Sequence, residues 1–84
     1  MSGKAVMSPA EILQILQSEA PEVNWTVDGD GYKYQVHAVG DVFSGLNAVK
    51  RQQFVYQLLN PYIADGRIHA VTIVAQTPAE HSGA

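Results

Sequence analysis

The sequence predicts an α+β fold in which a three-stranded mixed sheet packs against helices, in the order α-β-β-α-α-β. Three segments alternate apolar and polar residues with a period of two, which indicates strands, and two others repeat apolar residues at helical spacing. The chain has 84 residues, 46% hydrophobic and 15% charged, which suits one folded domain rather than a disordered segment. We expect an ordered core over about 8–78 with short flexible termini.

The first helix is predicted to begin at a capping box. Ser8 precedes Pro9, and Glu11 stands three residues after Ser8, so side chain and backbone can bond reciprocally. Pro21 ends this helix, because the residue before a proline disfavours helical geometry. The hairpin that follows consists of a strand over 23–28, a turn over 28–31 and a strand over 32–39.

A long helix is predicted to follow residues 43–47 and to run to about Asn60, where Pro61 starts a separate short helical turn. Residues 67–76 are predicted as a third strand that is apolar on both faces. Such a strand belongs inside a sheet or along a parallel pairing, so we place it beside the second strand through a right-handed crossover. A second capping box at 77–80 is expected to give only a frayed turn.

Composition excludes several classes of function. The chain has no Cys, which removes disulfides, a thiol nucleophile, a Cys-based zinc site and an iron–sulfur cluster held by its own thiolates. The net charge of −3 argues against a strong nucleic-acid binder. No apolar run approaches the length of a membrane span, and residues 1–7 lack the apolar region of a secretory signal, so we expect a cytoplasmic protein.

Catalytic patterns are weak. The carboxylates fall at helix caps and in turns, and no Ser stands in a strand-turn-helix elbow. Residues 28–31 (DGDG) lack the Lys of a P-loop and the Glu of a calcium loop, so a hairpin turn explains them better. We therefore expect a binding protein and no enzyme.

Three histidines are the remaining candidates for chemistry. His81 lies in the tail and is expected to be solvated. His37 falls mid-strand on the less buried face, where a structural role is more common than ligation. His69 lies at the entry of the last strand, where a loop can expose a ring nitrogen. The residues alone leave His69 open between an edge-of-core position and a ligand.

Four stretches of the sequence resemble the BolA-like family, in particular its bacterial IbaG (YrbA) branch. They are 43–52 (FSGLNAVKRQ), 55–56 (VY), 67–71 (RIHAV) and 77–80 (TPAE). The resemblance covers most of the chain and implies a fold related to the type II KH domain, with the element order predicted above.

The resemblance implies a non-enzymatic adapter that binds a monothiol glutaredoxin and shares a [2Fe-2S] cluster, in iron–sulfur trafficking or in iron or stress regulation. The glutaredoxin would contribute a Cys and a bound glutathione, and this chain would contribute His69. The isolated chain, a monomer or weak homodimer, is then expected to hold no cofactor.

One position departs from the family pattern. Many relatives carry His where this chain has Lys33, and the turn over 28–31 offers neither His nor Cys. The second protein ligand therefore stays open between Asp30, His37 and none. A cluster held by His69 alone on this side is expected to be labile.

Two other functions compete with cluster sharing. A KH-like transcriptional regulator that binds DNA would use Lys50, Arg51 and Arg67 against phosphates, although the Gly-x-x-Gly loop of KH domains is missing. A protein-interaction module could use the same basic helix face to bind acidic partners without metal. The purely structural alternative for these side chains is a solvated helix face.

Overall fold

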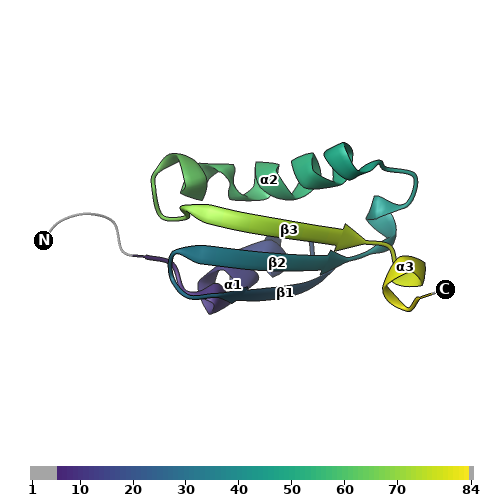
Figure 1. The fold of residues 1–84 in the computed structure, drawn as a ribbon, viewed down its shortest axis with the longest axis horizontal. Coiled ribbons are helices and arrows are strands. Elements are labelled where there is room, and N and C mark those ends of the chain that lie inside the picture. Colours follow the sequence, from purple (N-terminus) through teal and green to yellow (C-terminus); the bar gives the residue numbers. More distant parts are fainter. Residues whose placement is uncertain (1–5, 84) are drawn as a thin grey trace, which may run out of the picture.

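The computed structural model describes residues 6–83 and forms one sheet covered by helices (Figure 1). In chain order the elements are α1 (Pro9–Glu19), β1 (Asn24–Gly29), β2 (Lys33–Val39), the 3₁₀ turn η1 (Asp41–Phe43), α2 (Ala48–Ala64), β3 (Ala70–Gln76) and α3 (Pro78–His81). The predicted α+β class is confirmed. Flexible termini were also predicted. Residues 1–5 and 84, which belong to these termini, lie outside the described residues.

β2 is the central strand of the sheet. It pairs antiparallel with β1, as the hairpin turn predicts, and parallel with β3. The parallel register runs from Lys33 opposite Ala70 to Val39 opposite Gln76. The predicted parallel placement of the last strand beside the second is therefore confirmed, with β3 at an edge of the sheet.

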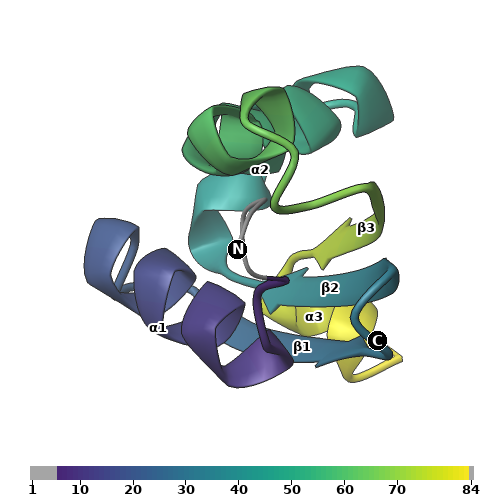
Figure 2. The ribbon, with the colours of Figure 1, turned by 90° about the vertical axis from the view of Figure 1, so that its left-hand side faces the viewer.

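Helices α1 and α2 cover one face of the sheet (Figure 2). The side chains of Ile12, Leu16, Val36, Val55 and Leu59 are fully buried between these layers. The burial follows from periodicity, because α1 and α2 each present an apolar stripe and β2 turns every second side chain inward.

The opposite face of the sheet is open and polar. Thr26, Asp28, Gln35 and Thr72 are exposed there, and Val74 keeps 40% of its surface in contact with solvent. The second apolar face predicted for the last strand is therefore only lightly covered. This open face carries the accessible functional groups of the strands.

Helix α2 is longer than predicted, because it continues through Pro61 to Ala64 instead of restarting there. Proline within a helix removes one backbone hydrogen bond and costs about 3 kcal/mol. The turn after Pro61 nevertheless packs the partly buried side chains of Tyr62 and Ile63 against the hydrophobic core. The predicted separate turn is wrong for that reason.

Strand β3 begins three residues later than predicted. The backbone N–H groups of Arg67 and Ile68 both donate to the carbonyl of Tyr62, at 2.9 and 3.1 Å, and so serve the end of α2 rather than the sheet. Ladder pairing begins only at Ala70. His69 consequently lies in the connecting loop, one residue before the strand.

The outer edge of β3 is covered by polar side chains of α2. Side-chain donors at three positions of the helix reach the outward carbonyls of alternate strand residues: Tyr56 to Val71 (3.4 Å), Gln52 to Ile73 (2.8 Å) and Arg51 to Ala75 (3.1 Å). An edge strand with free carbonyls is a template for pairing with another chain. The helix therefore protects this edge while its other face packs on the core.

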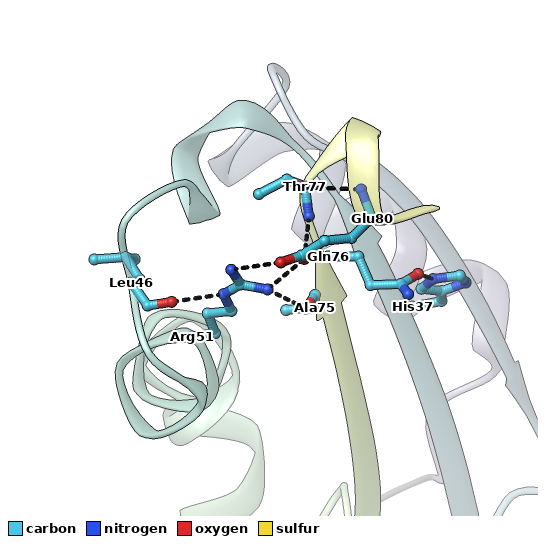
Figure 3. A network of polar contacts seen from close by, with 7 residues as sticks. All are labelled: His37, Leu46, Arg51, Ala75, Gln76, Thr77 and Glu80. Carbon is cyan, nitrogen blue, oxygen red and sulfur yellow. Dashed lines mark hydrogen bonds and ion pairs between the residues drawn. The ribbon is translucent and has the colours of Figure 1, made fainter. Parts of the chain in front are cut away.

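Helix α3 is a single turn held at the end of β3 (Figure 3). Its capping box is formed as predicted, since the Thr77 side chain accepts from the Glu80 N–H and the Glu80 carboxylate accepts from the Thr77 N–H. Arg51 of α2 donates to both carboxylate oxygens of Glu80, at 2.7 and 3.2 Å, and to the carbonyl of Leu46. The short helix is thus tied to α2 rather than left as an untethered turn.

We predict that the contribution of Glu80 to stability disappears in acid. The hydrogen bonds from Arg51, aided by that from Thr77, lower the pKa of Glu80 from 4.5 to about 2. A lowered pKa means that the stabilisation is present above pH 4.5 and is lost as the pH falls toward 2. In urea unfolding, the advantage of the wild type over Glu80→Gln should shrink across this window.

The matched control is the same comparison in an Arg51→Gln background, where this pH dependence should be largely absent. A difference between wild type and Glu80→Gln that stays constant from pH 7 to pH 2 would contradict the role of the ion pair.

Candidate functional site

His69 lies in the loop between α2 and β3, with its side chain exposed to solvent. The backbone on its C-terminal side is fixed, because the Ala70 N–H donates to the carbonyl of Tyr32 at 3.3 Å and Ala70 pairs with Lys33. An exposed imidazole on a fixed backbone can present a ring nitrogen to a partner. This placement agrees with the expectation that a loop exposes the side chain next to a strand.

The ring of Tyr32 stacks on the ring of His69, with centroids 5.3 Å apart and an interplanar angle of 25°. Tyr32 is itself 60% exposed, so the pair lies on the surface. Stacking covers one face of the imidazole and leaves its edge, which carries the nitrogens, accessible. Sequence reasoning missed Tyr32. Its one signal was the parallel pairing of the second and third strands, which places Tyr32, before Lys33, near His69, before Ala70.

Asp30 shapes the turn that carries Tyr32. Its carboxylate oxygen Oδ1 accepts from the N–H groups of Lys33 (2.8 Å) and Tyr32 (2.9 Å). These two hydrogen bonds lower the pKa of Asp30, because they stabilise its charged form. The turn therefore holds Asp30 as an anion at the same end of the sheet as His69.

A shallow hollow of about 450 Å³ lies beside this turn. Its lining includes Asp28, Asp30, Lys33, Gln35 and Thr72 from all three strands. The hollow opens on the polar face of the sheet and carries both signs of charge. Such a surface suits contact with a polar partner.

His37 is placed apart from His69. It lies four residues beyond Lys33 on β2, which at about 3.3 Å per residue is about 13 Å along the strand. Its Nε2 is 2.7 Å from the side-chain oxygen of Gln76 (Figure 3), and its ring contacts that of His81. The structure therefore does not bring His37 and His69 together as two ligands of one small cluster.

The three basic candidates do not gather into one patch. Lys50 is exposed in the first turn of α2, whereas Arg67 follows the end of that helix. The 17-residue helix is about 25 Å long, so the two basic residues lie far apart. Arg51 is engaged by Glu80, as described above, and Arg67 forms an ion pair with Asp65 at 3.3 Å. A continuous basic stripe for nucleic acid is not formed by these side chains.

Two features are absent from residues 6–83. Within this range, no group of three or more His, Cys, Asp or Glu side chains is arranged to hold a metal ion. Nor does any helix there combine the length and the apolar character needed to cross a membrane.

Fold and site together define a small α+β domain with an accessible histidine beside a charged turn. Among known proteins, a family profile described as BolA-like protein matches residues 6–80. The Acid stress protein IbaG of Escherichia coli (strain K12) is 50% identical over 74 residues, which is 88% of this chain and 88% of that protein. A protein from the rpoN-murA intergenic region of Acinetobacter guillouiae is 40% identical over 88% of this chain and 89% of its own.

Solved structures agree with this assignment. The BolA domain of SufE1 from Arabidopsis thaliana has a TM-score of 0.75 and 31% identity, covering 86% of this chain and 93% of that chain. A bolA protein homologue from Coxiella burnetii shares the fold with a TM-score of 0.81 at 24% identity, covering 92% of this chain and 99% of its own. The chain belongs to the BolA-like family, as its sequence predicted.

We predict that Tyr32 orients the His69 ring without being needed for folding. Tyr32→Ala should remove the ring-current shift of the His69 proton signals in NMR spectra, and Tyr32→Phe should keep it. Because the pair is exposed, the change in unfolding free energy should stay within about 0.5 kcal/mol, as for most surface substitutions. His69 signals that are identical in the wild type and Tyr32→Ala would show that the rings do not stack in solution.

Proposed function

We propose that this chain is a non-enzymatic BolA-type adapter that binds a monothiol glutaredoxin and lends His69 to a [2Fe-2S] cluster shared with it. The observation that carries the proposal is the exposed His69 imidazole, stacked on Tyr32 with its nitrogen-bearing edge accessible. An imidazole in this state needs no rearrangement of its own chain before it meets a partner. Preorganisation of this kind lowers the cost of binding.

The residues present fit one side of such a cluster. The chain has no Cys, so the thiolates would come from the glutaredoxin and its glutathione, and this chain would supply nitrogen. Imidazole in place of thiolate raises the reduction potential of a [2Fe-2S] centre. When bound, the cluster would supply one-electron chemistry and transferable iron and sulfide.

Charge near His69 favours the same partner. Lys33 is exposed and lies opposite Ala70, the residue after His69. A cluster ligated by thiolates is anionic, and the ammonium of Lys33 attracts it. Lys33, which stands where many relatives carry His, thus supplies an electrostatic contact and no ligand.

His69 acts as the single ligand from this chain in our proposal. Asp30 already accepts two backbone hydrogen bonds that form its turn, so ligation would compete with the turn itself. His37 lies about 13 Å along β2 from Lys33, the residue opposite Ala70. A cluster with one ligand on this side should exchange readily, which suits delivery of iron rather than storage.

The cellular role follows from the family. The relative from Escherichia coli is named an acid stress protein, and we propose a cytoplasmic role in iron–sulfur trafficking or in the response to stress. DNA binding is the weaker alternative, because Arg51 is held by Glu80 and Lys50 and Arg67 lie at opposite ends of α2.

The proposal predicts a spectral change when the wild type is mixed with a cluster-loaded monothiol glutaredoxin carrying glutathione. Visible absorption and circular dichroism should change for the wild type and for His37→Ala, the matched histidine control. His69→Ala should leave the spectrum of the glutaredoxin unchanged, because it removes the only ligand that we assign to this chain.

An unchanged spectrum with the wild type would refute cluster sharing. A change that survives in His69→Ala would place the ligand elsewhere. Calorimetry with the cluster-free glutaredoxin separates the two parts of the proposal, since partner binding without a spectral change would leave an adapter that holds no cluster.

A further inference from the structure

The fold brings two histidines together at the opposite end of β2 from Tyr32. His37 projects from the open face of the sheet, and His81 comes from α3, 44 positions later in the sequence. Their ring centroids are 5.3 Å apart, with an interplanar angle of 68°. Neither the cluster-sharing proposal nor the hydrophobic core uses this pair.

Gln76 fixes the protonation pattern of the His37 ring. Its side-chain oxygen Oε1 lies 2.7 Å from His37 Nε2 (Figure 3), and because an amide oxygen only accepts, Nε2 carries the proton. The other nitrogen, Nδ1, then has a free lone pair. A ligand histidine whose second N–H donates to a carbonyl or carboxylate oxygen is the usual arrangement at protein metal sites.

The spacing of the two rings matches ligation of one tetrahedral ion. With a metal–nitrogen distance of about 2.05 Å, each ring centroid would lie about 3.2 Å from the ion, so two imidazoles at the tetrahedral angle would have centroids about 5.2 Å apart. The observed separation is 5.3 Å. The centroid separation is therefore compatible with two imidazoles on one ion, as it is with an ordinary edge-to-face ring contact.

The surroundings admit and favour a cation. A hollow of about 270 Å³ on the open face is lined by His37, Gln76, Thr26 and Asp28, among others, and His81 is exposed beside it. Asp28 gives this hollow a carboxylate. An ion can therefore reach the pair from solvent and meets a negative charge there.

The backbone that carries the second histidine is held in place before any ion arrives. The capping box at Thr77 and the ion pair between Arg51 and Glu80 fix α3 at the end of β3. His81 directly follows Glu80 in this turn. Binding would therefore cost little ordering of the chain.

We propose that His37 and His81 form a binding site for one divalent transition-metal ion such as Zn²⁺, with Gln76 as a positioning residue. Since the structure between residues 6 and 83 shows no cluster of three ligating side chains, water completes the coordination. Affinity should then be lower than at zinc sites with three or four protein ligands. A bound ion would fasten α3 to the sheet and stabilise the folded chain by linkage.

Calorimetric titration of the untagged full chain with Zn²⁺ at pH 7.5 tests the site. The wild type and His69→Ala should bind about one equivalent, and their melting temperatures should rise with Zn²⁺. His81→Ala alters only an exposed side chain and should weaken Zn²⁺ binding at least about 10-fold. Loss of a ligand should cost no less than loss of a residue that only orients a ligand, which typically weakens metal binding about 10- to 100-fold.

Gln76 has its own pair of variants. Gln76→Ala should weaken Zn²⁺ binding about 10- to 100-fold, and Gln76→Glu, which keeps an acceptor for the His37 N–H, should restore it. Equal binding by the wild type and His81→Ala would overturn the proposal. Loss of binding in His69→Ala alone would also overturn it and would assign the ion to the other end of the sheet, so the outcome is independent of cluster sharing.

Discussion

The parallel pairing of β2 with β3 is the constraint on which both ends of this molecule depend. The two strands run in the same direction from Lys33 opposite Ala70 to Val39 opposite Gln76. Their starts therefore coincide, and so do their ends. At the start, the loop that carries His69 meets the turn that carries Tyr32, and at the end α3 comes beside the open face of β2.

Helix α2 makes this pairing possible by serving two purposes. Its apolar residues Val55 and Leu59 are fully buried against the sheet, where each buried aliphatic side chain contributes about 1.5–3 kcal/mol. Its polar side chains donate to the outward carbonyls of β3 and so prevent the edge from pairing elsewhere. One of them, Arg51, also ties α3 in place through Glu80. Arg51, one of the three basic residues that the sequence offered for partner binding, is thus engaged within the fold.

Local rules in the sequence predicted much of the fold. The capping boxes at Ser8 and Thr77 and the position of His37 on the less buried face of its strand depend on neighbouring residues only, and all are confirmed. The continuation of α2 through Pro61 was missed, because it depends on what the last turn buries.

The site was less predictable, because it depends on register between distant strands. The stacking of Tyr32 on His69 and the contact of His37 with His81 join residues 37 and 44 positions apart, and no periodicity reports such contacts. The sequence pattern did place His37 on the less buried face and His69 at a strand entry. It could not show that His37 lies with Gln76 rather than with His69, since that follows from the pairing of β2 with β3.

The most direct test of this account is the β2–β3 register in solution. Nuclear Overhauser measurements on the isolated protein should connect the strands in parallel, with Lys33 beside Ala70 and Val39 beside Gln76, and should show ring contacts of Tyr32 with His69 and of His37 with His81. A register shifted by one residue would turn the side chains of β3 to opposite faces. A shifted or antiparallel pairing, without these ring contacts, would contradict the placement of both histidine sites.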